Sequence, residues 1–509
     1  MRSNILFLLC LMIGTAHAQR AVDGLSDYQI HQLDSMTSVW EQHGLLNGGV
    51  GVIRDGNLIY QRSAGWANKE AKVPNSAATN FNLASVSKPF TAIAVLQLVG
   101  EKKLGLDKPL YSYLPEFPYP TITVRHLLSH TSGLPEDSEV MKEYIEMHPE
   151  VVISNREVYH MLTKGDYGLV YAPGTRHGYN NLNFVLLGLA IEEVTDVPFA
   201  TYMKEKVFGP AGMENTYVRH ADGPNTARYF YPTYHDSAVV NVDSLDRPAI
   251  YTNFHTGGLF GSSNVMTTIE DMAAFDKALD DDVLLSTSLK KQMLSPTVLD
   301  NGDTLRTGGG KKTFALGWNL NTQNSAGKHV VWHDGSLVGH TTIFYKNFTD
   351  DVSLVMYENE SNPHFFYKFL GMANVVEGLA GINVSLSKSL VREFGVTLVK
   401  EGTDAAVSKF NVFKRDTAYY MNEFEMNDLG YELLLRDTFS GHEMLALEVF
   451  KLNSLLFPDS SNAYDSYAEA LMENGKFDEA IAMYELTLRM NPANSLAQEN
   501  LAKLKKVRR

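Results

Sequence analysis

The C-terminal part of the chain repeats its own pattern with a period of 34 residues. Two runs share small, aromatic and proline positions, with Gly441, Ala446, Phe450 and Pro458 corresponding to Gly475, Ala480, Tyr484 and Pro492. A repeat of this length is typical of a helix–turn–helix unit that buries its apolar face only by stacking on a neighbour. The pattern therefore predicts consecutive helix pairs, most clearly over 427–460 and 461–494.

This pattern resembles the tetratricopeptide (TPR) repeat, and it predicts an all-α TPR-like module over 385–509. Two or so repeats are few for an independent solenoid, because each unit is stabilised by its neighbours. We therefore expect the module to pack on the preceding domain or on another subunit. Such a module is also a candidate surface for a protein partner or for self-association.

The first residues have the three parts of a secretory signal peptide. Arg2 supplies a positive start, an apolar run follows from Ile5 to Ile13, and Ala16-His17-Ala18 has the form of a cleavage site. We expect residues 1–18 to be removed between Ala18 and Gln19, and the protein to be exported to a periplasm or secreted. No other stretch has the length and apolarity of a membrane span.

The composition excludes several classes of function. The chain has 509 residues, a formal net charge of −15 and no clustered basic stripe, which argues against a nucleic-acid partner. Its single cysteine, Cys10, lies inside the predicted signal peptide. The mature chain then has no thiol for cysteine catalysis or for a cysteine-based metal site. We expect neither a metal nor a cofactor.

Between these two segments the patterns alternate between helix and strand. A helix is predicted over 26–46, a strand hairpin over 49–66 around Asp55-Gly56, and a largely buried helix after residue 85. Residues 220–256 have no clear period and are predicted to form long loops. Strand-like runs follow at 314–320, 328–335, 341–347 and 351–359, and a helix ends near residue 381.

Four stretches have the form Ser-x-x-Lys, which can mark a nucleophilic serine and its lysine partner. Serine is a weak nucleophile until a neighbour takes its proton, and residues three apart share one face of a helix. Burial between apolar walls can lower the pKa of the lysine enough for it to act as a base. The four stretches begin at Ser85, Ser288, Ser325 and Ser385.

Ser85 is distinguished from the other three by its surroundings. It follows the strand-like "FNLA" and opens the most apolar long helix, whose N-terminus favours developing negative charge. Ser288 fits a solvated helix start, Ser325 a polar turn and Ser385 a helix cap. We therefore expect Ser85 to be the nucleophile.

Several segments, in order, resemble the motifs of serine β-lactamase-like hydrolases. This group contains class C β-lactamases, D-Ala-D-Ala carboxypeptidases, D-aminopeptidases and related esterases. "SVSK" from Ser85 resembles the first motif, "YNN" from Tyr179 the Tyr-x-Asn motif, and "HDG" from His333 the third. The resemblance covers roughly residues 26–380.

The resemblance implies an α/β (α+β) fold of the serine β-lactamase/transpeptidase type. In this fold an antiparallel sheet is flanked by helices and joined by a helical subdomain. We expect it to occupy 19–384, followed by the TPR-like module over 385–509.

The resemblance also implies roles for individual residues. Ser85 would be the acylated nucleophile, and Lys88 and Tyr179 would share general-base and general-acid duty, with either one taking the first proton. Asn181 would hydrogen-bond the substrate and Lys88. His333 and Gly335 would occupy the third motif. The backbone N–H groups of Ser85 and Ser336 would form an oxyanion hole.

The third motif reads His333-Asp334-Gly335, where β-lactamases typically carry Lys-Thr-Gly. A histidine is mostly neutral at pH 7 unless its pKa is raised, so it suits a β-lactam carboxylate less well than lysine does. The sequence therefore predicts an exported serine hydrolase for small amides or esters such as D-amino-acid peptides. The alternatives are an esterase or weak β-lactamase of the same family, and an inactive scaffold that binds through the TPR-like module.

Two further patterns have competing interpretations. His126 and His130 have the i, i+4 spacing of two zinc ligands, but no third ligand is evident and a structural role in the loop is favoured. The aromatic residues of 227–238 could contact a substrate side chain, although ordinary loop packing is favoured.

Overall fold

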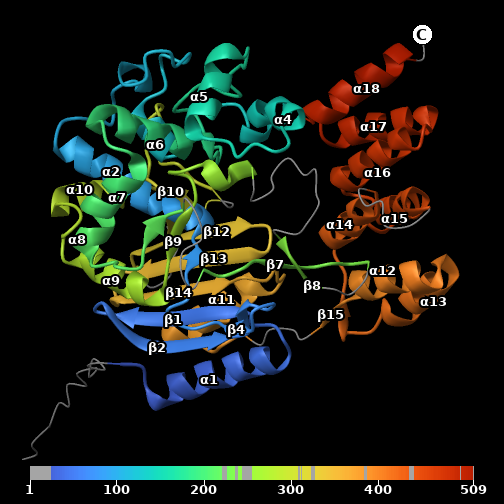
Figure 1. Cartoon of the computed structure of the whole chain (residues 1–509), viewed down its shortest axis with the longest axis horizontal. Coiled ribbons are helices and arrows are strands. Elements are labelled where there is room, and N and C mark those ends of the chain that lie inside the picture. The colour runs from blue at the N-terminus through green and yellow to red at the C-terminus, as the bar shows by residue number, and fades with distance from the viewer. Residues whose placement is uncertain are drawn as a thin grey trace, which may run out of the picture.

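The structure is a computed structural model of the whole chain (Figure 1). It describes residues 24–219, 226–235, 239–242, 255–307, 310, 312–321, 327–382, 387–434, 441–492 and 494–507. The predicted signal peptide and its cleavage site lie outside the described residues. In the part of the chain that is described, none of the helices combines the length and apolarity needed to cross a membrane.

A seven-stranded antiparallel sheet forms the centre of the larger domain. Its spatial order is β10-β11-β12-β13-β14-β1-β2, so the N-terminal hairpin pairs with a strand from the end of the domain. The strands are β1 Gly48–Arg54, β2 Asn57–Ala64, β10 Lys312–Phe314, β11 Asn319–Asn321, β12 Val330–Leu337, β13 His340–Asn347 and β14 Val352–Glu358.

The predicted hairpin is confirmed, with Asp55 and Gly56 at positive φ in the turn between β1 and β2. The prediction of one strand over 314–320 is wrong, because the segment spans the end of β10, a turn and the start of β11. The Ala315 N–H donates to the Trp318 carbonyl across this turn, and Gly317 has a φ of 81°. The apolar residues of this segment therefore belong to two short paired strands and the turn between them. Their apolar character alone suggests one continuous strand.

Helices cover both faces of the sheet (Figure 1). On one face α1 and α11 pack against Val50, Leu354 and Met356; on the other, α2, α6 and α9 belong to the main core with Phe344 and Val355. The two sets alternate along each strand, as the pleat requires. These helices are α1 Asp27–Gln42, α2 Ser87–Gly100, α6 Leu182–Thr195, α9 Ile269–Asp280 and α11 Phe365–Val376.

A helical subdomain and several short strands complete the domain. Its further helices are α3 Val124–Leu128, α4 Asp137–Met147, α5 Asn155–Lys164, α7 Phe199–Met203, α8 Gly209–Ala211 and α10 Thr287–Met293, with single turns η1 Ala84–Val86, η2 Leu110–Ser112, η3 Lys204–Phe208 and η5 His255–Gly258. The short strands are β3 Trp66–Asn68, β4 Val73–Pro74, β5 Phe81–Asn82, β6 Tyr217–Val218 and β9 Val265–Thr267. The fold is the predicted serine β-lactamase/transpeptidase type.

The described part of 220–256 contains a short hairpin that the sequence did not reveal, β7 Phe230–Pro232 and β8 Val239–Asn241. Each strand has only three residues, too few for a period to be visible. Tyr229, Phe230 and Tyr231 are buried. These aromatic side chains are therefore part of the packing, which is the interpretation that the sequence favoured.

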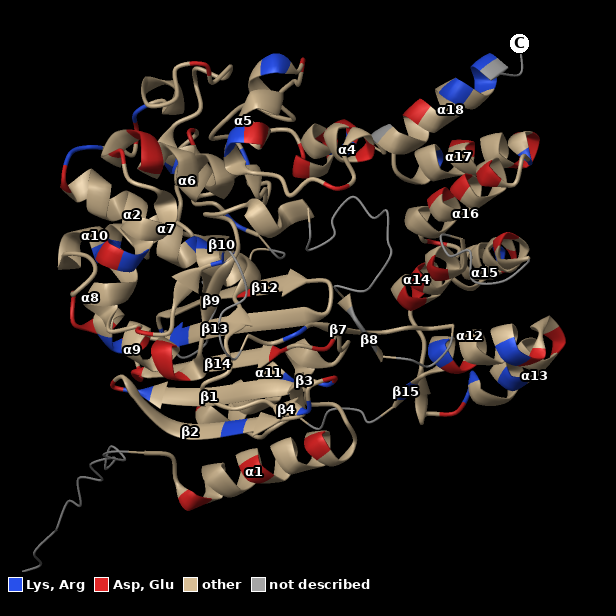
Figure 2. Ribbon diagram, viewed as in Figure 1, with Lys and Arg blue, Asp and Glu red and all other residues tan. Residues whose placement is uncertain are grey.

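The C-terminal module consists of successive helices, and a small parallel pairing joins β15 Lys388–Ser389, which precedes the first of them, to β16 Tyr419–Tyr420, which follows the second. Ala446 and Ala480, which correspond in the repeat, are fully buried, and so are Phe450 and Tyr484. The helices are α12 Leu390–Glu401, α13 Thr403–Phe413, α14 Glu423–Leu434, α15 His442–Leu456, α16 Ser461–Glu473, α17 Phe477–Met490 and α18 Ser495–Val507. Figure 2 shows acidic residues (red) along α14, α16 and α17 and basic residues (blue) near the end of α18.

A buried lysine connects three parts of the larger domain. The Lys346 ammonium on β13 is fully buried and donates to Asp276 (2.9 Å), Asp280 (2.5 Å) and Asp351 (3.1 Å). The neighbouring carboxylates raise the pKa of Lys346 against the opposing effect of burial. This group of charges joins α9 and the β13–β14 turn to the centre of the sheet.

Candidate active site

Ser85 lies in a tight turn between β5 and α2. The predicted helix is confirmed, but it begins at Ser87, and Ser85 belongs to the single 3-10 turn before it. The preceding residue, Ala84, has a left-handed φ of 47°. The Asn82 Oδ1 accepts a 2.8 Å hydrogen bond from the Ala84 N–H and fixes this unusual conformation. Ser85 is partly exposed in a stretch whose other residues are buried.

Lys88 is fully buried, and its ammonium has three hydrogen-bond partners. Its Nζ donates to the Ser85 Oγ (2.8 Å), the Asn181 Oδ1 (2.9 Å) and the Ser262 carbonyl oxygen (3.0 Å). Two of these partners are carbonyl oxygens, which cannot donate a hydrogen bond. When the lysine is neutral, its lone pair therefore faces the one partner that has a proton to give, the Ser85 hydroxyl.

Burial lowers the pKa of Lys88 to about 7, against a smaller opposing effect of the Asp137 and Asp334 carboxylates. A buried ammonium loses its hydration, so the charged form is disfavoured. A large fraction of the protein therefore contains a neutral Lys88 at neutral pH, although an unperturbed lysine would be almost fully protonated.

Asn181 is oriented by Asp137, a residue that the sequence analysis missed. The Asn181 Nδ2 donates a 2.9 Å hydrogen bond to the Asp137 Oδ2. A carboxylate only accepts, so the amide nitrogen faces Asp137 and the amide oxygen faces Lys88. Asp137 is the first residue of α4 and follows the "HTSGLP" segment. The sequence does show an acidic residue after this segment, but nothing in the spacing between Asp137 and Asn181 indicates that the two side chains would meet.

Asn181 also precedes α6, where it could have been a helix cap. Its side chain makes no capping hydrogen bond. The neighbouring Asn180 takes that role, because its Oδ1 accepts from the Leu182 N–H (2.8 Å). The side chain of Asn181 is thus directed to Lys88 and Asp137.

Tyr179 lies over the same lysine. Its ring centroid is 4.9 Å from the Lys88 Nζ, and its ring stacks on His130 with centroids 4.3 Å apart. Although 41% of the residue is exposed, burial of its hydroxyl end raises the pKa of Tyr179, against a lowering hydrogen bond with the Ser85 side chain. The phenol therefore stays protonated at neutral pH.

His130 and His126 occupy separate environments. The His130 Nδ1 accepts from the Asn180 N–H (3.2 Å) and is 2.9 Å from the Asn183 Nδ2, and its ring supports Tyr179. Burial lowers the pKa of His130 well below its usual value. The His126 Nε2 is 3.8 Å from Asp300. The two histidines therefore contact different groups: His130 contacts Asn180, Asn183 and Tyr179, and His126 lies near Asp300.

The third motif lies on β12, whose edge passes directly beside the nucleophile turn. A Cβ on Gly335 would lie 2.5 Å from the Leu83 carbonyl oxygen and 2.8 Å from the Ser85 backbone nitrogen, so only glycine fits there. His333 is buried, and its ring centroid is 6.2 Å from that of Tyr179. Burial lowers the pKa of His333 to about 3, which keeps the ring neutral. Ser336 follows on the same strand and is exposed.

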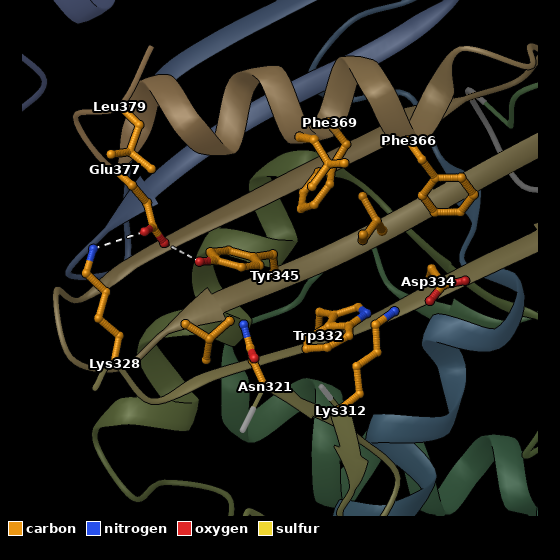
Figure 3. Close-up of a pocket in the computed structure, with 13 residues that line it drawn as sticks. Lys312, Asn321, Lys328, Trp332, Asp334, Tyr345, Phe366, Phe369, Glu377 and Leu379 are labelled. Carbon is orange, nitrogen blue, oxygen red and sulfur yellow. Dashed lines mark hydrogen bonds and ion pairs between the residues drawn. The ribbon is translucent and has the colours of Figure 1, made fainter. Parts of the chain in front are cut away.

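A cavity of about 770 Å³ lies on the opposite face of β12, between this edge of the sheet and α11 (Figure 3). Trp332 and Asp334 project into it, whereas His333 and Gly335, which alternate with them, face Ser85. Lys328 and Tyr345 both bond to Glu377 at one end of the cavity. The candidate catalytic side chains therefore do not line this cavity. They lie on the other face of β12, the strand that forms the floor of the cavity.

The other Ser-x-x-Lys stretches lie elsewhere. Ser288 is exposed in the first turn of α10, where Ser286 is the cap. Ser325 and Ser385 lie outside the described residues. The structure thus brings together, from three separate segments, Ser85, Lys88, Tyr179, Asn181, His333 and Gly335.

Comparison with known proteins identifies relatives of the chain. The family model described as Beta-lactamase matches residues 30–376, and one described as Tetratricopeptide repeat matches residues 461–504. Penicillin-binding protein 4* of Bacillus subtilis is 31% identical over 321 residues, which are 62% of this chain and 68% of the relative. A D-aminopeptidase of Gluconobacter oxydans is 26% identical over 57% of this chain and 51% of its own length.

The solved structures agree. A penicillin-binding protein from Bacillus halodurans superposes with a TM-score of 0.56 and 26% identity, over 67% of this chain and 98% of that one. Together with the family match over most of the chain, these similarities show that the protein belongs to the beta-lactamase family of serine hydrolases and carries a C-terminal tetratricopeptide-repeat region.

Proposed function

We propose that this protein is an exported serine hydrolase that forms an acyl-enzyme at Ser85 and acts on small amides or esters such as D-amino-acid peptides. The observation that carries the proposal is the arrangement around Lys88, where two of its three described hydrogen-bond partners are carbonyl oxygens and the third, the Ser85 hydroxyl, can give a proton. Export rests on the predicted signal peptide, and the amide substrates rest on the similarity to a D-aminopeptidase.

Lys88 is the better candidate for the first base. Its pKa of about 7 supplies a neutral amine, whereas burial raises the pKa of Tyr179. In the proposed step the amine takes the Ser85 proton while Oγ bonds to the substrate carbonyl carbon. Collapse of the tetrahedral intermediate expels the amine or alcohol, which takes a proton from the Lys88 ammonium through the Tyr179 hydroxyl. Water then releases the acid by the same route.

The developing oxyanion would be held by the backbone N–H groups of Ser85 and Ser336. The close contact between Gly335 and the Ser85 nitrogen supports this assignment, because it sets the third-motif strand against the nucleophile turn. Donors fixed in this way stabilise the transition state without having to reorganise, and one of them is typically worth about 10²–10³ in kcat.

The charges at the site favour a substrate amine over a substrate carboxylate. The neutral His333 brings no positive charge to the third motif, and the Asp137 and Asp334 carboxylates act on Lys88 from two sides. We therefore expect D-aminoacyl amides and esters to be hydrolysed more readily than β-lactams, whose carboxylate would find no cationic third-motif residue and would be repelled by the nearby negative charge. An esterase or a weak β-lactamase is the alternative within the same mechanism.

A fluorophosphonate probe tests the nucleophile without knowledge of the substrate. We expect covalent labelling of the folded, full-length wild type at Ser85, identified by peptide mass. Labelling should be lost in Ser85→Ala and kept in the matched variant Ser288→Ala, which alters an exposed serine of the same motif form. A folded wild type that is not labelled would refute the proposal. Turnover of D-aminoacyl amides, simple esters and nitrocefin then ranks the substrate classes.

A further inference from the structure

The C-terminal module is joined to the larger domain through buried polar contacts. The Glu432 carboxylate on α14 accepts hydrogen bonds from the Tyr234 N–H (2.9 Å) and lies 2.8 Å from the His235 Nδ1. The side chains of Glu432 and His235 are 0% and 7% exposed. Asp428, one turn earlier on α14, accepts from the Tyr231 hydroxyl (3.0 Å). All three partners belong to the segment of the β7–β8 hairpin.

The fit between the two parts is also close in shape. Tyr234 packs against both the main core and the core of the module. A Cβ on Gly395 of α12 would lie 2.3 Å from the Tyr234 carbonyl oxygen, so the helix approaches as near as a backbone allows. This hairpin is therefore held from one side by the module (Figure 1).

At its other end the same segment supports the nucleophile turn. The Tyr229 hydroxyl accepts a 3.0 Å hydrogen bond from the Asn82 N–H, and the Asn82 side chain holds the Ala84 N–H. Ala84 has the left-handed φ that presents Ser85. The Tyr229 ring also stacks on His340, with centroids 4.0 Å apart, at the turn that follows the third motif.

We propose that the C-terminal module is a positioning element of the serine site, and that Glu432 acts through the β7–β8 hairpin on the turn that presents Ser85. The inference rests on the proposed function, since it assigns the module to the same nucleophile. A left-handed φ is disfavoured for a residue that has a Cβ, so the backbone conformation of Ala84 persists only while its surroundings enforce it. Release of the hairpin would let the turn relax and move the Ser85 Oγ away from Lys88.

The test compares the labelling kinetics of variants in the full chain. We expect Glu432→Gln, which keeps an acceptor but removes the charge, to lower the maximal rate of fluorophosphonate labelling by about tenfold, because small misplacements of a reacting atom have large effects on rate. The half-saturating probe concentration should stay within about twofold. Glu432→Ala should have a larger effect, so that glutamine partly rescues it.

Tyr431→Phe is the matched control. It removes the hydroxyl of the adjacent residue of α14, whose hydrogen bonds go to Ser466 and Glu469 inside the module and not to the hairpin. We expect labelling by this variant to match the wild type. Circular dichroism and thermal unfolding establish which variants are folded at the assay temperature.

Tyr229→Phe perturbs the other end of the hairpin and changes no residue of the module. A double-variant cycle compares the labelling rates of Glu432→Gln, Tyr229→Phe and the variant that carries both substitutions. If Glu432 acts through the hairpin, the double variant should lose about as much as one single variant, because both remove the same support. Fully additive losses, or a wild-type rate in folded Glu432→Gln, would overturn the inference. An unlabelled wild type would instead refute the proposed function, so the two failures are distinguishable.

Discussion

Removal of the charge on Asp137 should make the site more active in mild acid. The carboxylate reaches Lys88 through two hydrogen bonds of 2.9 Å joined by the Asn181 amide, which places it within about 8 Å of the ammonium. At an effective dielectric constant near 20, two unit charges at this distance interact by about 2 kcal/mol. Asp137 is half-buried, and screening by solvent reduces the effect to about one pH unit.

The direction of the expected pKa change of Lys88 follows from the negative charge that the substitution removes. Asp137 stabilises the charged form of Lys88 and raises its pKa, so Asp137→Asn should lower that pKa below its present value of about 7. The new asparagine can still accept the hydrogen bond from the Asn181 Nδ2 through its own amide oxygen. The substitution therefore removes the charge but keeps the orientation of the Asn181 side chain. Lys88 would then be neutral, and able to act as base, at a lower pH.

The assay is the rate of fluorophosphonate labelling at Ser85 from about pH 5 to about pH 9. In the wild type we expect the rate to rise with pH to a plateau, with a midpoint near the pKa of about 7. In Asp137→Asn the midpoint should move down by about one pH unit. Glu136→Gln is the control, because it removes an exposed charge from the preceding residue. A midpoint that is unchanged or higher in Asp137→Asn would refute the assignment of Lys88 as the base.

Three further substitutions test other parts of the structure. Tyr179→Phe should lower turnover of an amide or ester substrate by about 10²-fold or more, and it should leave the midpoint of the pH profile of labelling in place, because the protonated phenol is not the group that titrates. Gly335→Ala should lower the labelling rate by about 10²-fold, since the new methyl group would meet the Ser85 nitrogen; urea unfolding separates this loss from a loss of fold. Lys346→Met should lower the free energy of unfolding in urea by about 3–5 kcal/mol, because it leaves the buried Asp276 carboxylate without its charged partner, and a change below about 1 kcal/mol would contradict this account.

The parts of the site that sequence revealed are those with a local signature. Ser85 and Lys88 are three positions apart at the start of an apolar helix, so their proximity could be predicted from helical geometry. The Tyr179-x-Asn181 motif and His333 are far from Ser85 and from each other in the chain, and only the order of motifs shared with a family linked them. Asp137 was missed because its role depends on which way an amide is turned, and spacing carries no information about that.

The same distinction holds for the fold. The Asp55-Gly56 hairpin and the 34-residue repeat depend on neighbouring residues, and both were predicted. The β7–β8 hairpin was not, because its conformation depends on acids of α14 almost 200 positions later in the chain, such as Glu432, which is 198 residues from Tyr234. Tertiary contacts of this kind override weak local preferences.

The strand order of the central sheet has a consequence for how the chain folds. The β1–β2 hairpin lies at the edge of the sheet and pairs on its inner side with β14, and the Asn47 and Asn359 side chains that bond beside this pairing are 312 residues apart. If the β1–β2 hairpin forms early, the edge of β1 that pairs with β14 stays unpaired until almost the whole domain has been synthesised. Long-range pairing of this kind slows folding and leaves an edge that can capture other chains. Truncations before residue 352 should accumulate as aggregates and not as smaller folded domains.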